Sequence, residues 1–187
     1  MKQRWKRWMA ACMAVLMALP SLLAGGVSAS AASPSAKLSC WNASARQVGE
    51  VPELKPGYDY DKVLYFMIDG HTGYCMNYEL AAKGGQVMVS GDTRRTPLTD
   101  QEALYLRYCL YYGFSTDVTA SPSADQRNQF IATQVLVWII EKGLYGTASA
   151  DSAASKMCAS APDPAASFQY YADLKSKIDT GVRAEIR

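Results

Sequence analysis

The sequence predicts an α+β domain in which strands come first and helices follow. Three observations predict this class. Residues 62–68 are rich in β-branched and aromatic residues, as buried strands are. Two helix-capping patterns begin farther along the chain, at Thr99 and at Ser123. No internal repeat is present that would indicate a repeat architecture.

The first 31 residues have the layout of a secretory signal peptide. Four basic residues lie between Lys2 and Arg7, an apolar run extends from Trp8 to Leu23, and Ala29-Ser30-Ala31 supplies a small-residue cleavage site. The apolar run is shorter and more interrupted than a spanning helix requires, so an uncleaved anchor is the less favoured alternative. We therefore predict an exported protein.

About 155 of the 187 residues follow this leader, which is enough for one domain with its own core. We expect residues 32–37 to be a flexible lead-in, residues 38–187 to be the folded domain, and further domains to follow in the natural protein. The chain has 19 basic and 17 acidic residues, but the leader holds four of the basic ones, so the remainder has a net charge of −2. This charge argues against nucleic acid as a partner. No later apolar run is long enough to predict a second membrane segment.

The predicted strands lie between Cys40 and Tyr78. Residues 40–56 have no sustained period and indicate irregular structure or short strands. Residues 62–68 predict a buried strand, 69–73 have turn chemistry, and 74–78 resume an alternating pattern. Together the last three segments predict a β-hairpin with Cys75 just past its turn.

The predicted helices follow a loop at residues 83–97. Thr99 and Glu102 form a capping-box pattern that opens a helix from Asp100 to about Tyr112, which Gly113 ends. A second helix, which either Ser123 with Gln126 or Asp125 alone can cap, runs to Lys142. Its residues 131–140 are apolar on nearly every side, so this helix should be central. A stretch rich in Ser and Ala (147–161) separates it from a last helix, which Asp163 caps and Pro164 begins.

Two residues stand out chemically. Gln134 lies in the almost wholly apolar part of the central helix, where an unpartnered buried amide costs about 1–3 kcal/mol. It therefore requires a partner or a reaction. Cys75 lies next to the predicted hairpin turn, between Tyr74 and Met76. A cysteine thiolate held against a glutamine carboxamide can expel ammonia and form a thioester, because close positioning is worth roughly 7–11 kcal/mol. An apolar wall that includes Trp138, one turn after Gln134, would keep water from the bond.

The segment Tyr74-Cys75-Met76-Asn77 resembles the aromatic-Cys-hydrophobic-Asn/Asp signature of the thioester domains of Gram-positive surface adhesins. The segment from Thr133 to Trp138 is similar to their second signature, a Thr-Gln motif closed by Trp, and 111–114 is similar to their Tyr-Gly-aromatic segment. One position departs from the pattern, because Leu136 stands where the family commonly has Ala. The resemblance spans roughly residues 60–145.

This resemblance implies that the folded domain is a thioester domain at a bacterial cell surface, with a bond between Cys75 and Gln134. Tyr74, Thr133 and Trp138 would support the bond. His71 is a further supporting candidate, as a proton acceptor for Cys75 or for the incoming amine, although a polar residue in the hairpin turn is the favoured alternative. The implied function is covalent capture of an amine, usually a lysine, on a host or neighbouring-cell surface molecule. The module would react once rather than turn over, without a metal or cofactor, and would be secreted or attached to the cell wall.

Two alternatives remain open. In the first, Cys75 is the nucleophile of a cysteine hydrolase or transpeptidase and His71, the only histidine, is its base, although such enzymes usually draw the histidine from a distant element. In the second, the domain binds without reacting. Among the other cysteines, Cys40 and Cys158 are weakly favoured as a disulfide and Cys109 as a buried thiol.

Overall fold

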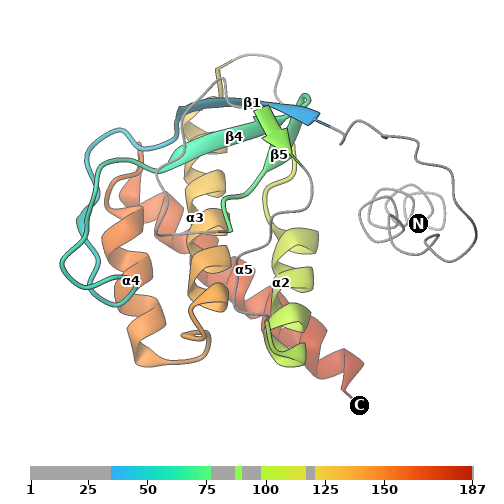
Figure 1. The fold of residues 1–187 in the computed structure, drawn as a ribbon. Helices are drawn as coiled ribbons and strands as arrows, with labels where there is room; N and C mark the ends of the chain where they lie inside the picture. The colour runs from blue at the N-terminus through green and yellow to red at the C-terminus, as the bar shows by residue number, and fades with distance from the viewer. Residues whose placement is uncertain (1–34, 77–86, 90–97, 117–120, 187) are drawn as a thin grey trace, which may run out of the picture. The chain divides into compact units, whose positions relative to one another are not determined.

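A four-stranded antiparallel sheet and four helices make up most of the described part of the chain (Figure 1). The computed structural model describes residues 35–76, 87–89, 98–116 and 121–186. The sheet has the order β5-β4-β1-β6. A separate two-stranded sheet pairs β2 with β3. The strands are β1 (Ser35–Asn42), β2 (Gly49–Glu50), β3 (Asp59–Tyr60), β4 (Leu64–Ile68), β5 (His71–Gly73) and β6 (Val87–Val89).

Strand β1 begins earlier than the sequence predicts. Residues 35–37 pair with β6 and residues 38–42 pair with β4, so Cys40 lies opposite Phe66 in a strand of eight residues. The flexible lead-in predicted at 32–37 is therefore wrong for its last three residues. The pairing is made between main chains distant in sequence, which side-chain composition does not reveal. The predicted leader (1–31) lies outside the described residues.

The hairpin of β4 and β5 is confirmed, but its turn is tighter than predicted. Asp69 (φ 50°) and Gly70 (φ 88°) are the two turn residues, and both have the positive φ of a type I′ turn. His71 is thereby the first residue of β5, opposite Ile68, rather than a turn residue. Residues 74–76 follow β5 without strand pairing, which corrects that part of the predicted strand 74–78; the remainder is outside the described residues.

The helices are α2 (Asp100–Tyr112), α3 (Ala124–Glu141), α4 (Ala148–Cys158) and α5 (Pro164–Glu185). Both predicted capping boxes are present, Thr99 with Glu102 and Ser123 with Gln126. Helix α4 was not predicted, because its Ser- and Ala-rich sequence carries a weak apolar pattern. It forms because small residues on one face, together with Met157, bury against the rest of the core.

Helix α3 is central, as its sequence predicts. Every residue from Phe130 to Ile140 is buried. The helix packs against α2, α4, α5 and strand β4, and in Figure 1 it lies between α4 and α2, below the sheet. Side chains of α3 therefore reach the sheet from within the core. Among the described residues, no helix is both long and apolar enough to cross a membrane.

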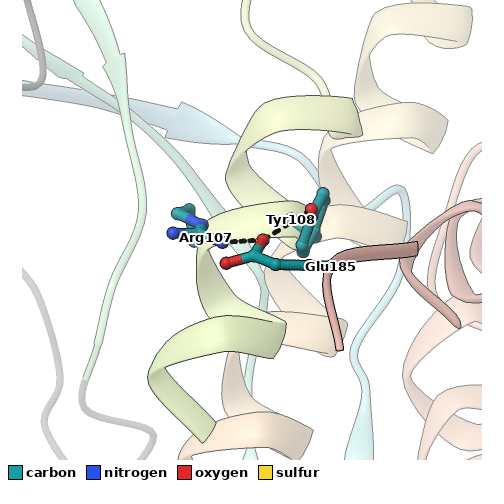
Figure 2. A network of polar contacts seen from close by, with 3 residues as sticks. All are labelled: Arg107, Tyr108 and Glu185. Carbon is teal, nitrogen blue, oxygen red and sulfur yellow. Dashed lines mark hydrogen bonds and ion pairs between the residues drawn. The ribbon is translucent and has the colours of Figure 1, made fainter. Parts of the chain in front are cut away.

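An exposed polar cluster joins α2 to the C-terminal end of α5 (Figure 2). The carboxylate of Glu185 accepts hydrogen bonds from the guanidinium of Arg107 and from the hydroxyl of Tyr108, the latter at 2.7 Å. Gly181 allows the two helices to approach here, because a Cβ at this position would lie 2.6 Å from the Tyr108 ring. Helix α5 accordingly continues past Gly181.

The predicted disulfide between Cys40 and Cys158 is not formed, since both residues are free cysteines. The end of α4 meets the chain at Ser44 instead, whose hydroxyl lies 2.9 Å from that of Ser160.

Candidate functional site

Cys75 is held at the edge of the helical core by the residue before it. The Tyr74 ring stacks on Phe130 of α3, with 5.2 Å between centroids and 9° between planes. Its hydroxyl donates a hydrogen bond to the main-chain carbonyl of Phe114, in the segment that follows α2. The segment after β5 is thus attached to two separate parts of the helical layer, and Cys75 follows directly as a half-buried residue.

Gln134 meets Cys75 across 59 positions of sequence. Its side chain is fully buried, and its carboxamide makes two hydrogen bonds with the main chain of Cys75. The Cys75 N–H donates to Gln134 Oε1 at 2.8 Å, and Gln134 Nε2 donates to the Cys75 carbonyl at 2.7 Å. The oxygen and the nitrogen of the Gln134 amide are therefore both hydrogen-bonded to Cys75, the other residue that stands out in the sequence.

An aromatic cluster lies beside this pair. Tyr65 contacts both Phe130 (4.5 Å between centroids) and Phe114 (5.9 Å), and Tyr74 stacks on Phe130. The residue before Cys75 thus packs on an aromatic surface. The sequence predicted an apolar wall of Trp138 and the aromatic residues around it; in the structure Tyr74, which precedes Cys75, stacks on Phe130.

Trp138 lies one turn after Gln134 and is almost completely buried. Its ring contacts Tyr60 of β3, with 6.2 Å between centroids. Its indole N–H is buried and has no hydrogen-bond acceptor among the described residues. The residue contributes an apolar surface on the helix turn that carries Gln134.

Thr133 points to a different neighbour from Gln134. Its hydroxyl accepts a hydrogen bond from the Phe114 N–H (3.1 Å) and donates one to the Gln129 carbonyl (3.0 Å). Gly113 makes this contact sterically feasible, because a Cβ there would lie 2.5 Å from Thr133 Cγ2. Thr133 thus fixes the segment that receives the Tyr74 hydroxyl, and it supports Cys75 indirectly. It also lines a cavity of about 170 Å³ between the end of α2, α3 and α5.

Cys109 and Cys158 are buried, whereas Cys75 and Cys40 are partly buried. Cys109 is completely buried in α2, as predicted, and burial raises the pKa of its thiol far above the usual range. Burial also raises the pKa of Cys158 to about 11. Both groups stay protonated at neutral pH, and a protonated thiol is a poor nucleophile. Burial likewise raises the pKa of the Tyr74 hydroxyl well above its ordinary value, which keeps it a neutral hydrogen-bond donor.

Two other predicted site residues have distinct positions. His71 is exposed in β5, on the strand that leads to Cys75. Leu136, which departs from the family pattern, is completely buried in α3. Its bulk is accommodated in the core while Gln134 keeps both contacts with Cys75.

Sequence reasoning missed the main-chain groups of Cys75, which make two hydrogen bonds with the Gln134 amide. No residue pattern specifies them, since all residue types except proline carry the same N–H and C=O. Phe130 was also missed as the surface on which Tyr74 stacks. Its place in α3, one turn before Gln134, is the signal that could have identified it.

Comparison with known proteins identifies the fold family. A family model described as the thioester domain (TED) matches residues 72–179, which include both Cys75 and Gln134. Searches among curated proteins and among solved structures returned no match. The family match covers more than half of the 187 residues, and it spans the two segments that the structure brings together. On these grounds the chain belongs to the thioester-domain family.

Proposed function

We propose that Cys75 and Gln134 form an internal thioester through which this module attaches covalently to an amine on a partner molecule. The observation that carries the proposal is the pair of hydrogen bonds, 2.7 and 2.8 Å long, that hold the Gln134 carboxamide against the Cys75 main chain.

The arrangement supports bond formation because it removes the entropy cost of bringing the two groups together. The thiolate of Cys75 attacks Gln134 Cδ, the C–S bond forms, and the C–N bond breaks. The amide nitrogen leaves as ammonia with the proton that the thiol supplied. Enforced proximity is worth roughly 7–11 kcal/mol in such reactions, which is what an unreactive amide requires.

The product stores an activated acyl group in a partly protected place. Gln134 is buried, whereas Cys75 is half-buried, so a nucleophile reaches the acyl carbon from the side of Cys75. An incoming amine forms an amide with Cδ and releases the Cys75 thiol. The module is thereby consumed in one reaction and remains joined to its target.

Membership in the thioester-domain family supports an adhesin role for this module. We propose that it is exported by its leader and displayed at a Gram-positive cell surface, joined to the cell wall through further domains. Its target would be a lysine on a host or neighbouring-cell surface protein.

The experiment is intact-mass spectrometry of the secreted chain before and after methylamine. We expect the untreated protein to be lighter than its sequence mass by one ammonia and the treated protein to gain one methylamine. Cys75→Ala should show neither change. Cys40→Ala is the matched control, since Cys40 is also partly buried and should leave both changes intact. A parent protein at full sequence mass that ignores methylamine contradicts the proposal.

Thiol alkylation of the native protein separates this function from the cysteine hydrolase. A thioester masks Cys75, so the parent should resist alkylation there and Gln134→Ala should expose the thiol. A hydrolase that uses Cys75 and His71 requires a free Cys75 thiol in the parent. Alkylation of Cys75 in both proteins would therefore favour the hydrolase.

A further inference from the structure

We infer that the main chain of Cys75 is part of the reaction machinery: its N–H stabilises the oxyanion, and its carbonyl holds the nitrogen that leaves or attacks. This inference rests on the proposed thioester. It extends that proposal by assigning the groups that stabilise the intermediates and by specifying which amines the site accepts.

The Cys75 N–H contacts Gln134 Oε1, the atom on which negative charge develops. When sulfur attacks Cδ, the electron pair of the C=O bond moves onto Oε1, which becomes an oxyanion. The Cys75 N–H already lies 2.8 Å from that atom. Donors at 2.7–3.1 Å from a developing oxyanion are the usual source of stabilisation in acyl transfer. Because Oε1 belongs to a fully buried side chain, the N–H acts where water does not screen it.

The Cys75 carbonyl contacts Gln134 Nε2, the nitrogen of the amide. This nitrogen donates to the Cys75 carbonyl at 2.7 Å, and it is the atom that departs as ammonia. Its departure breaks this hydrogen bond to the carbonyl. Aminolysis retraces the same path with an amine in place of ammonia, so the incoming nitrogen takes the place of Nε2 and donates an N–H to the carbonyl.

The two contacts also orient the reacting groups. They align the plane of the carboxamide with the N–H and C=O of Cys75, as in a pair of hydrogen-bonded strands. The main chain of Cys75 thereby holds the carboxamide next to the residue that carries the thiol.

The number of N–H groups on the amine decides how well it reacts, and primary amines are preferred. A primary amine attacks Cδ, the C–S bond breaks, and the thiolate takes the proton that the nitrogen loses. The amide product keeps one N–H, which restores the hydrogen bond to the Cys75 carbonyl. A secondary amine has a single N–H, and the reaction transfers that proton to the thiolate, so its hydrogen bond to the Cys75 carbonyl breaks as the proton leaves. Loss of this bond during the reaction should slow a secondary amine by about tenfold or more.

The test compares the rates at which methylamine, dimethylamine and isopropylamine form adducts with the thioester form of the full chain. Intact-mass spectrometry measures each adduct. The reference is a short peptide thioester treated with the same free-base concentrations. We expect dimethylamine to be slowed about tenfold or more relative to the reference ratio. Isopropylamine, which is branched but primary, controls for size and should be slowed much less. Equal slowing of both, or a ratio equal to the reference, overturns the inference.

A spectroscopic measurement tests the oxyanion donor separately. The infrared spectrum is recorded on a chain labelled with ¹³C at the glutamine Cδ atoms. Its thioester carbonyl band should lie at lower wavenumber than the band of the equally labelled reference thioester in an aprotic solvent. A band at the aprotic position overturns the role of the Cys75 N–H. A chain that carries no thioester by mass overturns the proposed function and this inference together, whereas a thioester with reference-like selectivity overturns this inference alone.

Discussion

Two polar junctions join distant parts of this molecule, and they differ in their exposure to water. At the first, Gln134 is completely buried and makes two neutral hydrogen bonds with Cys75. At the second, Arg107 and Glu185 are both exposed and form a charged pair that Tyr108 extends (Figure 2). Two opposite charges attract each other more strongly than two neutral groups do. An exposed charged pair nevertheless contributes little to stability, because water competes for both charges. Burial should therefore make the uncharged junction the more important one.

The largest expected effect comes from removing the buried amide. In a Cys75→Ala background, where no thioester forms, Gln134→Leu removes both hydrogen bonds to the main chain of residue 75. Each lost hydrogen bond of a buried group costs about 1–3 kcal/mol, so the free energy of unfolding should fall by about 2–6 kcal/mol. Chemical denaturation measures it. Gln129→Leu, at a partly exposed position of the same helix, is the control and should change stability much less. Equal losses of stability in Gln134→Leu and Gln129→Leu would show that the buried junction contributes no more than a partly exposed position of the helix.

The next effect tests the core that surrounds the buried junction. Leu136→Ala restores the residue common in the family but removes a completely buried side chain. We expect a loss of about 2–5 kcal/mol in the free energy of unfolding, because the packed helix cannot close around the cavity. Methylamine uptake below the unfolding temperature should persist. A neutral substitution would mean that this core is loosely packed.

A smaller effect is expected at the rim of the site. Tyr74→Phe keeps the ring that stacks on Phe130 but removes the hydrogen bond to the Phe114 carbonyl, at a cost of about 1–2 kcal/mol. Thioester formation, measured by the loss of ammonia, should slow because Cys75 is held less firmly. Tyr65→Phe, in the neighbouring ring of the cluster, controls for loss of a phenol and should leave that rate closer to the parent rate.

Alkaline pH provides a second measurement on the same variant. The pKa of Tyr74 is raised in the folded state, so the unfolded chain loses this proton first. The contribution of Tyr74 is complete below its unfolded pKa of about 10 and is lost as pH rises above it. Stability should therefore fall less steeply above about pH 10 in Tyr74→Phe than in the parent. Identical slopes would contradict burial of this hydroxyl.

The smallest effect is expected at the exposed junction. Glu185→Gln removes the charge that Arg107 and Tyr108 share, and the change in stability should disappear as salt is added, because ions screen exposed charges. Arg107 lowers the pKa of Glu185, so any contribution is present above the unfolded carboxyl pKa and is lost as pH falls through the folded one. A salt-independent loss comparable to that of Gln134→Leu would reverse the comparison.

Several features of the fold could be predicted from local sequence. The capping boxes of α2 and α3 and the strand at β4 were confirmed because each depends on neighbouring residues. Helix α4 and the start of β1 were missed for the opposite reason. The first forms through burial of small residues, and the second through pairing with β4 and β6.

By itself, the sequence determined which residues stand out: an amide in an apolar helix at Gln134 and a cysteine beside a hairpin at Cys75. It also determined the α+β class. Only the tertiary structure decided that these two residues meet, that main-chain groups of Cys75 hold both ends of the amide, and that Cys40 and Cys158 do not pair. The physical reason is that helix caps and turns depend on groups a few residues apart. Contacts across 59 residues depend on how the sheet and α3 pack.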